Sequence, residues 1–181
     1  MIWLAFVLLV GVGAGVTIAF TIKNGIGPTP TSPRQARNMV ECIQGSPALI
    51  VDLGSGWGSL AFLLARTFPT SRIVGIENSP LPYLVSRSIK RLSRLRNLEF
   101  QRFNFLDVPL PKADVFVCYL HRAAMSRLKA KLESETDGEA LLIANTFAIT
   151  GWTPEKVVET KDLYRSKIYC YKIPAKASRT R

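Results

Sequence analysis

Apolar and polar positions divide the chain into an uncharged apolar run, a short linker and a long region of alternating strand-like and helix-like patterns. Residues 2–22 form the apolar run, and no charged residue precedes Lys23. Residues 23–32 are rich in Gly, Pro and Thr, which cannot continue a helix. We therefore expect a segment at 1–22, a linker at 23–32, one folded domain at 33–175 and a basic tail at 176–181.

The apolar run is long enough to cross a bilayer as a helix. At about 1.5 Å per residue, it spans roughly the 30 Å thickness of the hydrocarbon core. A cleavable signal peptide is the main alternative, but it would carry Lys or Arg ahead of a shorter apolar core. Met1 is followed directly by Ile2 and Trp3. We expect a single-pass transmembrane anchor that is not cleaved.

Within the domain, continuous apolar runs typical of buried strands alternate with helical spacing. The strands are expected at 48–53, 72–77, 98–104, 114–120 and 140–147, and a closing hairpin at 156–160 and 166–173. The helices are expected at 33–43, 60–68 and 80–95, with one more containing Met125, Leu128 and Leu132. This alternation predicts an α/β, Rossmann-like fold: a mostly parallel sheet with helices on both faces and an antiparallel hairpin at its edge.

Composition narrows the possible functions only partly. The 181 residues include 24 Lys and Arg against 13 Asp and Glu, a net charge of +11. Such a charge attracts nucleic acid, anionic lipid or acidic protein without distinguishing them. The single histidine and three widely spaced cysteines argue against a metal site and a disulfide scaffold, and they fit a reducing compartment.

The strongest chemical signal lies where the first strand meets the first helix of the α/β region. There Asp52 precedes a turn that contains Gly54, Ser55, Gly56 and Gly58. Glycines at such a turn let the backbone bend sharply and approach a ligand beside a helix N-terminus. The spacing departs from the G-x-G-x-x-G of dinucleotide enzymes. A second acid, Glu77, ends the next strand, where a carboxylate can accept ribose hydroxyls.

These features resemble those of the class I S-adenosylmethionine-dependent methyltransferases over residues 33–173. The resemblance implies that S-adenosyl-L-methionine is the cofactor, with Asp52 and the 54–58 turn at its methionine part and Glu77 at its ribose. It also implies an adenine contact after the third strand. Asn104 is the better match, with Phe105 flanking the adenine, and Asp107 is the alternative. An amide oxygen can accept from the adenine amino group.

A narrower resemblance rests on four features together: the N-terminal apolar run, Pro-Thr-Pro at 28–30, the sequence from Asp52 to Gly56, and Gly-Trp-Thr-Pro at 151–154. This set is similar to the small membrane-anchored protein-lysine methyltransferases of mitochondria and their uncharacterised bacterial relatives. The mitochondrial members modify a membrane component of the ATP synthase and the adenine nucleotide carrier. The resemblance implies N-methylation of lysine in a membrane or membrane-associated protein.

The residues that act on the methyl acceptor are not defined by the sequence. Tyr119, at the end of the fourth strand, and His121, directly after it, are candidates to line the acceptor pocket, although Tyr119 also suits core packing and His121 suits a helix start. Trp57 suits packing or substrate contact. A nucleic-acid acceptor is disfavoured for two reasons. Enzymes that methylate amino groups of adenine or cytosine normally carry Asn/Asp-Pro-Pro-aromatic after the fourth strand, where this chain has Tyr119-Leu120-His121-Arg122. Enzymes that methylate a cytosine carbon need a nucleophilic cysteine, and Cys118 lies within the strand, where packing is expected. A small-molecule or lipid methyltransferase and a cofactor-binding membrane protein without turnover remain as alternatives.

Charge around the apolar run predicts its orientation. Lys23, Arg34 and Arg37 follow it, and no acid comes before Glu41. The positive-inside tendency therefore predicts a catalytic domain that faces the cytoplasm. The basic residues of the 80–96 region are expected to be solvated or to contact anionic lipid headgroups.

Overall fold

The structure is a computed structural model that describes residues 3, 15, 31–136 and 138–173. The predicted anchor, apart from Trp3 and Gly15, lies outside these residues, as do most of the predicted linker and the basic tail. Over the part that is described, no helix has the length and apolar character needed to span a bilayer.

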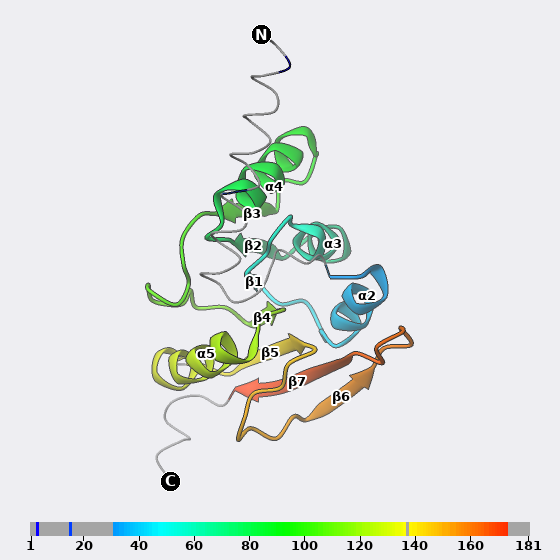
Figure 1. Cartoon of the computed structure of the whole chain (residues 1–181), viewed down its shortest axis with the longest axis vertical. Helices are drawn as coiled ribbons and strands as arrows, with labels where there is room; N and C mark the ends of the chain where they lie inside the picture. The colour runs from blue at the N-terminus through cyan, green and yellow to red at the C-terminus, as the bar shows by residue number, and fades with distance from the viewer. Residues whose placement is uncertain (1–2, 4–14, 16–30, 137, 174–181) are drawn as a thin grey trace.

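One sheet of seven strands organises the described domain (Figure 1). Its strands are β1 (Leu49–Leu53), β2 (Arg72–Ile76), β3 (Leu98–Gln101), β4 (Val115–Cys118), β5 (Ala140–Asn145), β6 (Lys156–Glu159) and β7 (Lys167–Ile173). Their order is β3-β2-β1-β4-β5-β7-β6. The first five are parallel to one another, whereas β7 is antiparallel to both β5 and β6. The Rossmann-like α/β prediction and its antiparallel end are confirmed.

Helices cover both faces of this sheet. They are α2 (Pro33–Glu41), α3 (Ser59–Thr67), α4 (Pro80–Leu92) and α5 (Arg122–Glu135). Side chains of α2 and α3, such as Met39 and Leu64, pack with Ile50 and Ile73 in one apolar core. Leu128 and Leu132 of α5 pack with Val51 and other strand residues in a second core on the opposite face. The continuous apolar strands are therefore buried from both sides, as expected for a parallel sheet.

Several elements end earlier than their sequence pattern predicts. The third strand was expected to reach Asn104, but β3 stops at Gln101 because its partner β2 stops at Ile76, which lies opposite Gln101. Tyr119 likewise lies just beyond β4 rather than within it. The helix expected at 80–95 ends at Leu92, since Ser93 has an extended backbone. These differences move Asn104 and Tyr119 from strands into loops at the carboxyl edge of the sheet.

Candidate active site

The turn between β1 and α3 is fixed onto the neighbouring strand. Gly54, Gly56 and Gly58 have φ values of 79°, 54° and 85°, in the left-handed region. The backbone N–H groups of Gly54 and Ser55 both donate to the carbonyl of Ile76, each at 2.9 Å. The turn is therefore held against the carboxyl end of β2, where it forms one wall of a cavity.

A phenyl ring fills the space beneath this turn. A Cβ atom added at Gly58 would come within 2.7 Å of the Phe100 ring, and one added at Gly75 would also come within 2.7 Å of it. The same atom at Gly75 would lie 3.0 Å from the Ser55 hydroxyl oxygen. Both glycines are thus required by close approach of the ring.

Glu77 follows β2 directly and is 7% exposed. Its Oε2 accepts from the backbone N–H of Gly56 at 2.8 Å, and its Oε1 accepts from the N–H of Ser79, the N-cap residue of α4, at 2.7 Å. The carboxylate therefore joins the glycine turn to the start of α4. Each carboxylate oxygen has capacity for a second hydrogen bond, so a diol can still bind.

Asp52 lies one layer deeper, within β1, and is 3% exposed. Burial, together with the nearby negative charge of Glu77, raises the pKa of Asp52 to about 7, while a hydrogen bond from the backbone of Ala61 opposes the shift. Ala61 is in the first turn of α3. The carboxyl group thus contributes to capping this helix, but its Oδ2 has no hydrogen-bond partner.

A cavity of about 370 Å³ opens at the carboxyl ends of β1 to β4. Among the residues described, four buried side-chain polar atoms have no hydrogen-bond partner, and three of these belong to residues that line this cavity. They are Asp52 Oδ2, Ser55 Oγ and His121 Nδ1. Because buried polar groups are normally satisfied, their clustering marks a binding site.

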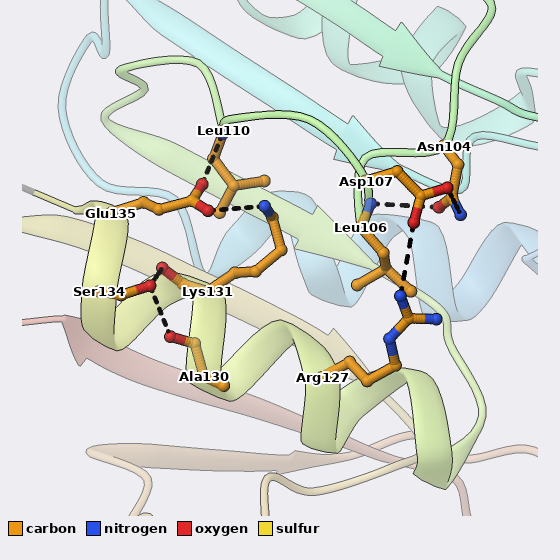
Figure 2. Close-up of polar contacts among 9 residues, drawn as sticks. All are labelled: Asn104, Leu106, Asp107, Leu110, Arg127, Ala130, Lys131, Ser134 and Glu135. Atoms are coloured by element: carbon orange, nitrogen blue, oxygen red, sulfur yellow. Dashed lines mark hydrogen bonds and ion pairs between the residues drawn. The ribbon is translucent and has the colours of Figure 1, made fainter.

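The opposite wall is the loop after β3, which is fastened to α5 (Figure 2). Asn104 lines the cavity, and its Oδ1 accepts from the N–H of Leu106 at 3.1 Å. Its Nδ2 donates to Asp107 Oδ2 at 2.7 Å. The Arg127 guanidinium in turn forms an ion pair with Asp107 Oδ1 at 3.4 Å. Phe105, only 7% exposed, also lines the cavity, whereas Asp107 is not among the lining residues.

The remaining predicted residues lie at the same cavity. Tyr119 lines it, and its ring stacks on Phe147 with centroids 6.5 Å apart. His121 is the N-cap residue of α5 and also contributes to the lining, as does Trp57. The structure thus brings together most of the predicted residues: Asp52, Gly54, Ser55, Gly56, Glu77, Asn104, Phe105, Tyr119 and His121. Gly58 is not among the lining residues, because it lies beneath the turn against the Phe100 ring.

Two lining residues from distant segments had not been singled out from the sequence. Thr31, placed in the predicted linker, reaches the cavity. Arg127, on α5, reaches it from a helix whose sequence pattern indicates only core packing. Neither residue lies in a sequence motif that would indicate a binding site, because each is brought to the cavity only by the packing of distant segments. No group of three or more His, Cys, Asp or Glu residues that could hold a metal ion occurs in the described part of the chain.

Comparison with known proteins identifies this arrangement. A family model of the ANTKMT methyltransferase domain matches residues 52–156, more than half of the 181 residues. The chain belongs to this family. The match covers the ANTKMT-type domain from the acid before the glycine turn to the start of β6.

Two relatives of this ANTKMT-type domain are protein-lysine methyltransferases by name. A protein-lysine N-methyltransferase of Saccharolobus islandicus is 29% identical over 135 residues, which are 74% of this chain and 84% of that protein. The adenine nucleotide translocase lysine N-methyltransferase of Mus musculus is 27% identical over 128 residues, 70% of this chain and 56% of that protein. The chain thus matches most of the archaeal relative but less than two thirds of the mouse one.

A solved structure agrees with the ANTKMT-type assignment. An RNA methyltransferase of Salinibacter ruber in complex with S-adenosyl-L-homocysteine has a TM-score of 0.72 at 26% identity, covering 81% of this chain and 94% of that one. Together with the family match, this shows that the protein is an S-adenosylmethionine-dependent methyltransferase. When bound, this cofactor supplies a methyl group on a positively charged sulfur.

Proposed function

We propose that this protein N-methylates lysine in a membrane or membrane-associated protein. Its family consists of S-adenosylmethionine-dependent protein-lysine methyltransferases, in agreement with the names of its relatives. The observation that carries the proposal is the cavity at the carboxyl edge, where three unpartnered buried polar atoms lie beside aromatic lining residues.

The polar half of the cavity fits the cofactor. The Asp52 Oδ2 atom, buried without a partner, suits the cationic ammonium of a methionine moiety. The remaining acceptor capacity of Glu77 suits ribose hydroxyls, and Asn104 with Phe105 suits a flat heterocycle. Each of these residues would hold the cofactor at one end of the cavity.

The other half of the cavity suits a long side chain that ends in an amine. Trp57, Phe103 and Tyr119 contribute aromatic surface, which packs against methylene groups and attracts a cationic or methylated nitrogen. In the reaction, a neutral lysine nitrogen forms a bond to the methyl carbon while the sulfur–carbon bond breaks, and the amine releases a proton. Such an in-line displacement depends mainly on position, so the lining that fixes both partners carries most of the catalysis.

Membrane attachment is part of the proposal. The uncharged residues 1–22 support an anchor, and Lys23, Arg34 and Arg37 support a domain on the cytoplasmic side. Because Thr31 lines the cavity, the linker ends at the site itself. A linker of about ten residues reaches at most roughly 35 Å, which keeps the site close to a bilayer and raises the effective concentration of a membrane-embedded substrate.

The test uses the full chain with S-adenosylmethionine labelled in its methyl group, and with membranes, soluble protein and RNA offered separately. We expect label in a membrane-protein band, on lysine after hydrolysis. Label in an organic extract would favour a lipid or small-molecule acceptor, label in RNA a nucleic-acid enzyme, and binding without transfer a protein that does not turn over. Each of these three outcomes would contradict the proposal.

Two variants sharpen this test. Removal of residues 1–23 should leave cofactor binding intact but slow the methylation of membranes more than that of a soluble lysine peptide. The Asp52→Ala variant should lose transfer to both acceptors. Topology is tested by adding protease to the outside of sealed cells, where the domain should remain uncut.

A further inference from the structure

The turn between β6 and β7 presents two large apolar side chains to solvent. Leu163 is 90% exposed and Tyr164 is 85% exposed, although nearly all other large apolar residues of the described domain are at least half buried. Basic residues flank them, with Lys161 before and Arg165 and Lys167 after. Figure 1 shows this turn, in orange, beside the blue α2 helix.

Strand direction places this turn at the same edge of the sheet as the active-site cavity. Asn145, the last residue of β5, lies opposite Ile168 near the start of the antiparallel β7. The turn that precedes β7 therefore projects beyond the carboxyl ends of the parallel strands. With strands about 4.8 Å apart, β7 is only about 10 Å from β4, whose end contributes to the cavity.

Hydrogen bonds tie the turn to the point where the N-terminal segment enters the domain. The Arg34 guanidinium donates to the carbonyl of Lys161 at 2.6 Å, and Gln35 Nε2 donates to Asp162 Oδ2 at 3.1 Å. Gln35 also forms a capping box with Ser32 at the start of α2. Thr31, one residue earlier, lines the cavity. The exposed turn is thus connected through the start of α2 to Thr31 at the edge of the cavity.

The chemistry of this surface fits an anionic lipid bilayer. Tyrosine and leucine suit the boundary between headgroups and acyl chains, where one end of the side chain stays hydrated. The surrounding surface is positive: Lys161, Arg34 and Arg37 are exposed. Arg165 contributes less, because its guanidinium pairs with Glu159 at 2.6 Å. The acid within the turn, Asp162, accepts from Ser166 N–H at 2.8 Å and from Gln35.

We propose that the β6–β7 turn, residues 160–166, contacts the membrane, with Leu163 and Tyr164 entering the interface and the neighbouring cations on anionic headgroups. The proposal rests on the membrane location argued above and adds an orientation: the edge that carries the cavity faces the bilayer. A protein partner fits less well, because two side chains offer far less than the roughly 800 Å² per partner of a specific interface.

This orientation separates the turn from the other exposed apolar and basic surface. Helix α4 begins at Pro80, just after the carboxyl end of β2, and runs to Leu92 near the opposite edge. Leu92 is 90% exposed and lies beside basic residues, Arg91 and Arg94. Leu92 therefore provides a matched control, because it has similar exposure and similar neighbouring charge but lies at the edge of the domain that should face away from the bilayer.

The experiment measures the depth of both positions. An environment-sensitive fluorophore is attached to the full-length Tyr164→Cys or Leu92→Cys variant, since the three native cysteines are buried. Each labelled protein is placed in phosphatidylcholine vesicles with or without phosphatidylglycerol, and quenching by nitroxide lipids is recorded. We expect quenching at 164 that is at least about twofold stronger in anionic vesicles, and little quenching at 92.

Other outcomes are decisive. If the protein floats with the vesicles but 164 is not quenched, or is quenched no more than 92, the proposed contact is wrong while the anchor stands. If the protein does not float with the vesicles, both proposals fail.

As a functional measure, Leu163→Ser with Tyr164→Ser should slow methylation of membrane protein at least about fivefold without changing that of a soluble peptide. Equal slowing in detergent would indicate protein docking instead and overturn the proposal.

Discussion

The carboxylate of Glu77 accepts the backbone N–H of Gly56 at 2.8 Å, so the residue after the second strand holds the turn after the first. The sequence had assigned Glu77 to the cofactor ribose. In the structure it also binds the N–H of Ser79 and thereby fixes the start of α4. One buried carboxylate thus shapes the site before any ligand arrives, and its loss should alter both the fold and binding.

Glu77→Gln should weaken cofactor binding by at least about tenfold and lower the melting temperature. The amide keeps the shape of the side chain, but its NH₂ group must face one of two backbone donors, which leaves a buried group unsatisfied at a cost of about 1–3 kcal/mol. Calorimetry and thermal melts measure both effects. Glu99→Gln is the control, because that exposed carboxylate pairs with Arg72 on the surface and should change neither. Undiminished affinity in Glu77→Gln would remove Glu77 from the site.

Cofactor affinity should rise between about pH 6 and 8 because the pKa of Asp52 is raised to about 7. The cationic ammonium of S-adenosylmethionine favours the carboxylate, so binding releases a proton below this pKa. Titration calorimetry in buffers of different ionisation enthalpy detects this proton, and Asp52→Asn should flatten the pH profile. A flat profile in the unmodified protein would contradict the assignment.

The same group has the opposite effect on the domain without cofactor. Since its pKa is raised above the ordinary 3.8, the folded state retains a proton that the unfolded state loses. The contribution of Asp52 to the free energy of unfolding should therefore fall from about pH 4 to about pH 7 and then level off. Denaturant titrations of the protein and of Asp52→Asn, compared across this range, isolate that contribution.

Gly58→Ala should destabilise the domain more than Gly56→Ala. Both residues have positive φ, which costs an alanine about 1–2 kcal/mol, but only at Gly58 would the new Cβ collide with the Phe100 ring. Nothing lies within 4 Å of a Cβ at Gly56, which lines the cavity. Gly56→Ala should therefore lose less stability than Gly58→Ala, and its main effect should be weaker cofactor binding. Urea unfolding measures the loss of stability in each variant, and cofactor titration measures the loss of affinity. An equal loss of stability in both variants would show that the Phe100 ring moves to accommodate the new Cβ.

Asn104→Ala should weaken cofactor binding about fivefold, the value of one hydrogen bond of about 1 kcal/mol net. Asp107→Ala is the matched variant, because it removes the neighbouring acceptor of Asn104 and the Arg127 contact but lies outside the lining. It should have the smaller effect on affinity. If Asp107→Ala weakens binding and Asn104→Ala does not, the adenine contact is at 107.

The cofactor half of the site could be predicted because its determinants are local. Asp52 and the glycines are consecutive, and Glu77 ends the adjacent strand, so parallel pairing of β1 with β2 brings them together. Strand ends were less accurate, because pairing with a neighbour decides them: β3 stops where β2 offers no further partner. An apolar sequence pattern indicates which residues are buried, but it does not indicate how long the adjacent strand is.

Contacts between distant segments could not be predicted. Arg127 and Asp107 are 20 residues apart, and Gln35 and Asp162 are 127 apart. Each is an ordinary polar residue in its own segment, and only the packing of α5 and α2 brings it to its partner. The role of Thr31 was hidden for the same reason, since a Pro/Thr-rich stretch indicates a linker whether or not its end returns to the site.

The close fit between Gly75 and the Phe100 ring bears on how sequences of this family can diverge. Gly75 has ordinary strand geometry, so only the ring and the Ser55 hydroxyl prevent a methyl group there. A change of Phe100 to a smaller residue would remove the closer of these two contacts, and alanine at 75 would then refill part of the space. We expect the two positions to vary together among relatives, as a small–large pair beneath the glycine turn, while either change alone is selected against.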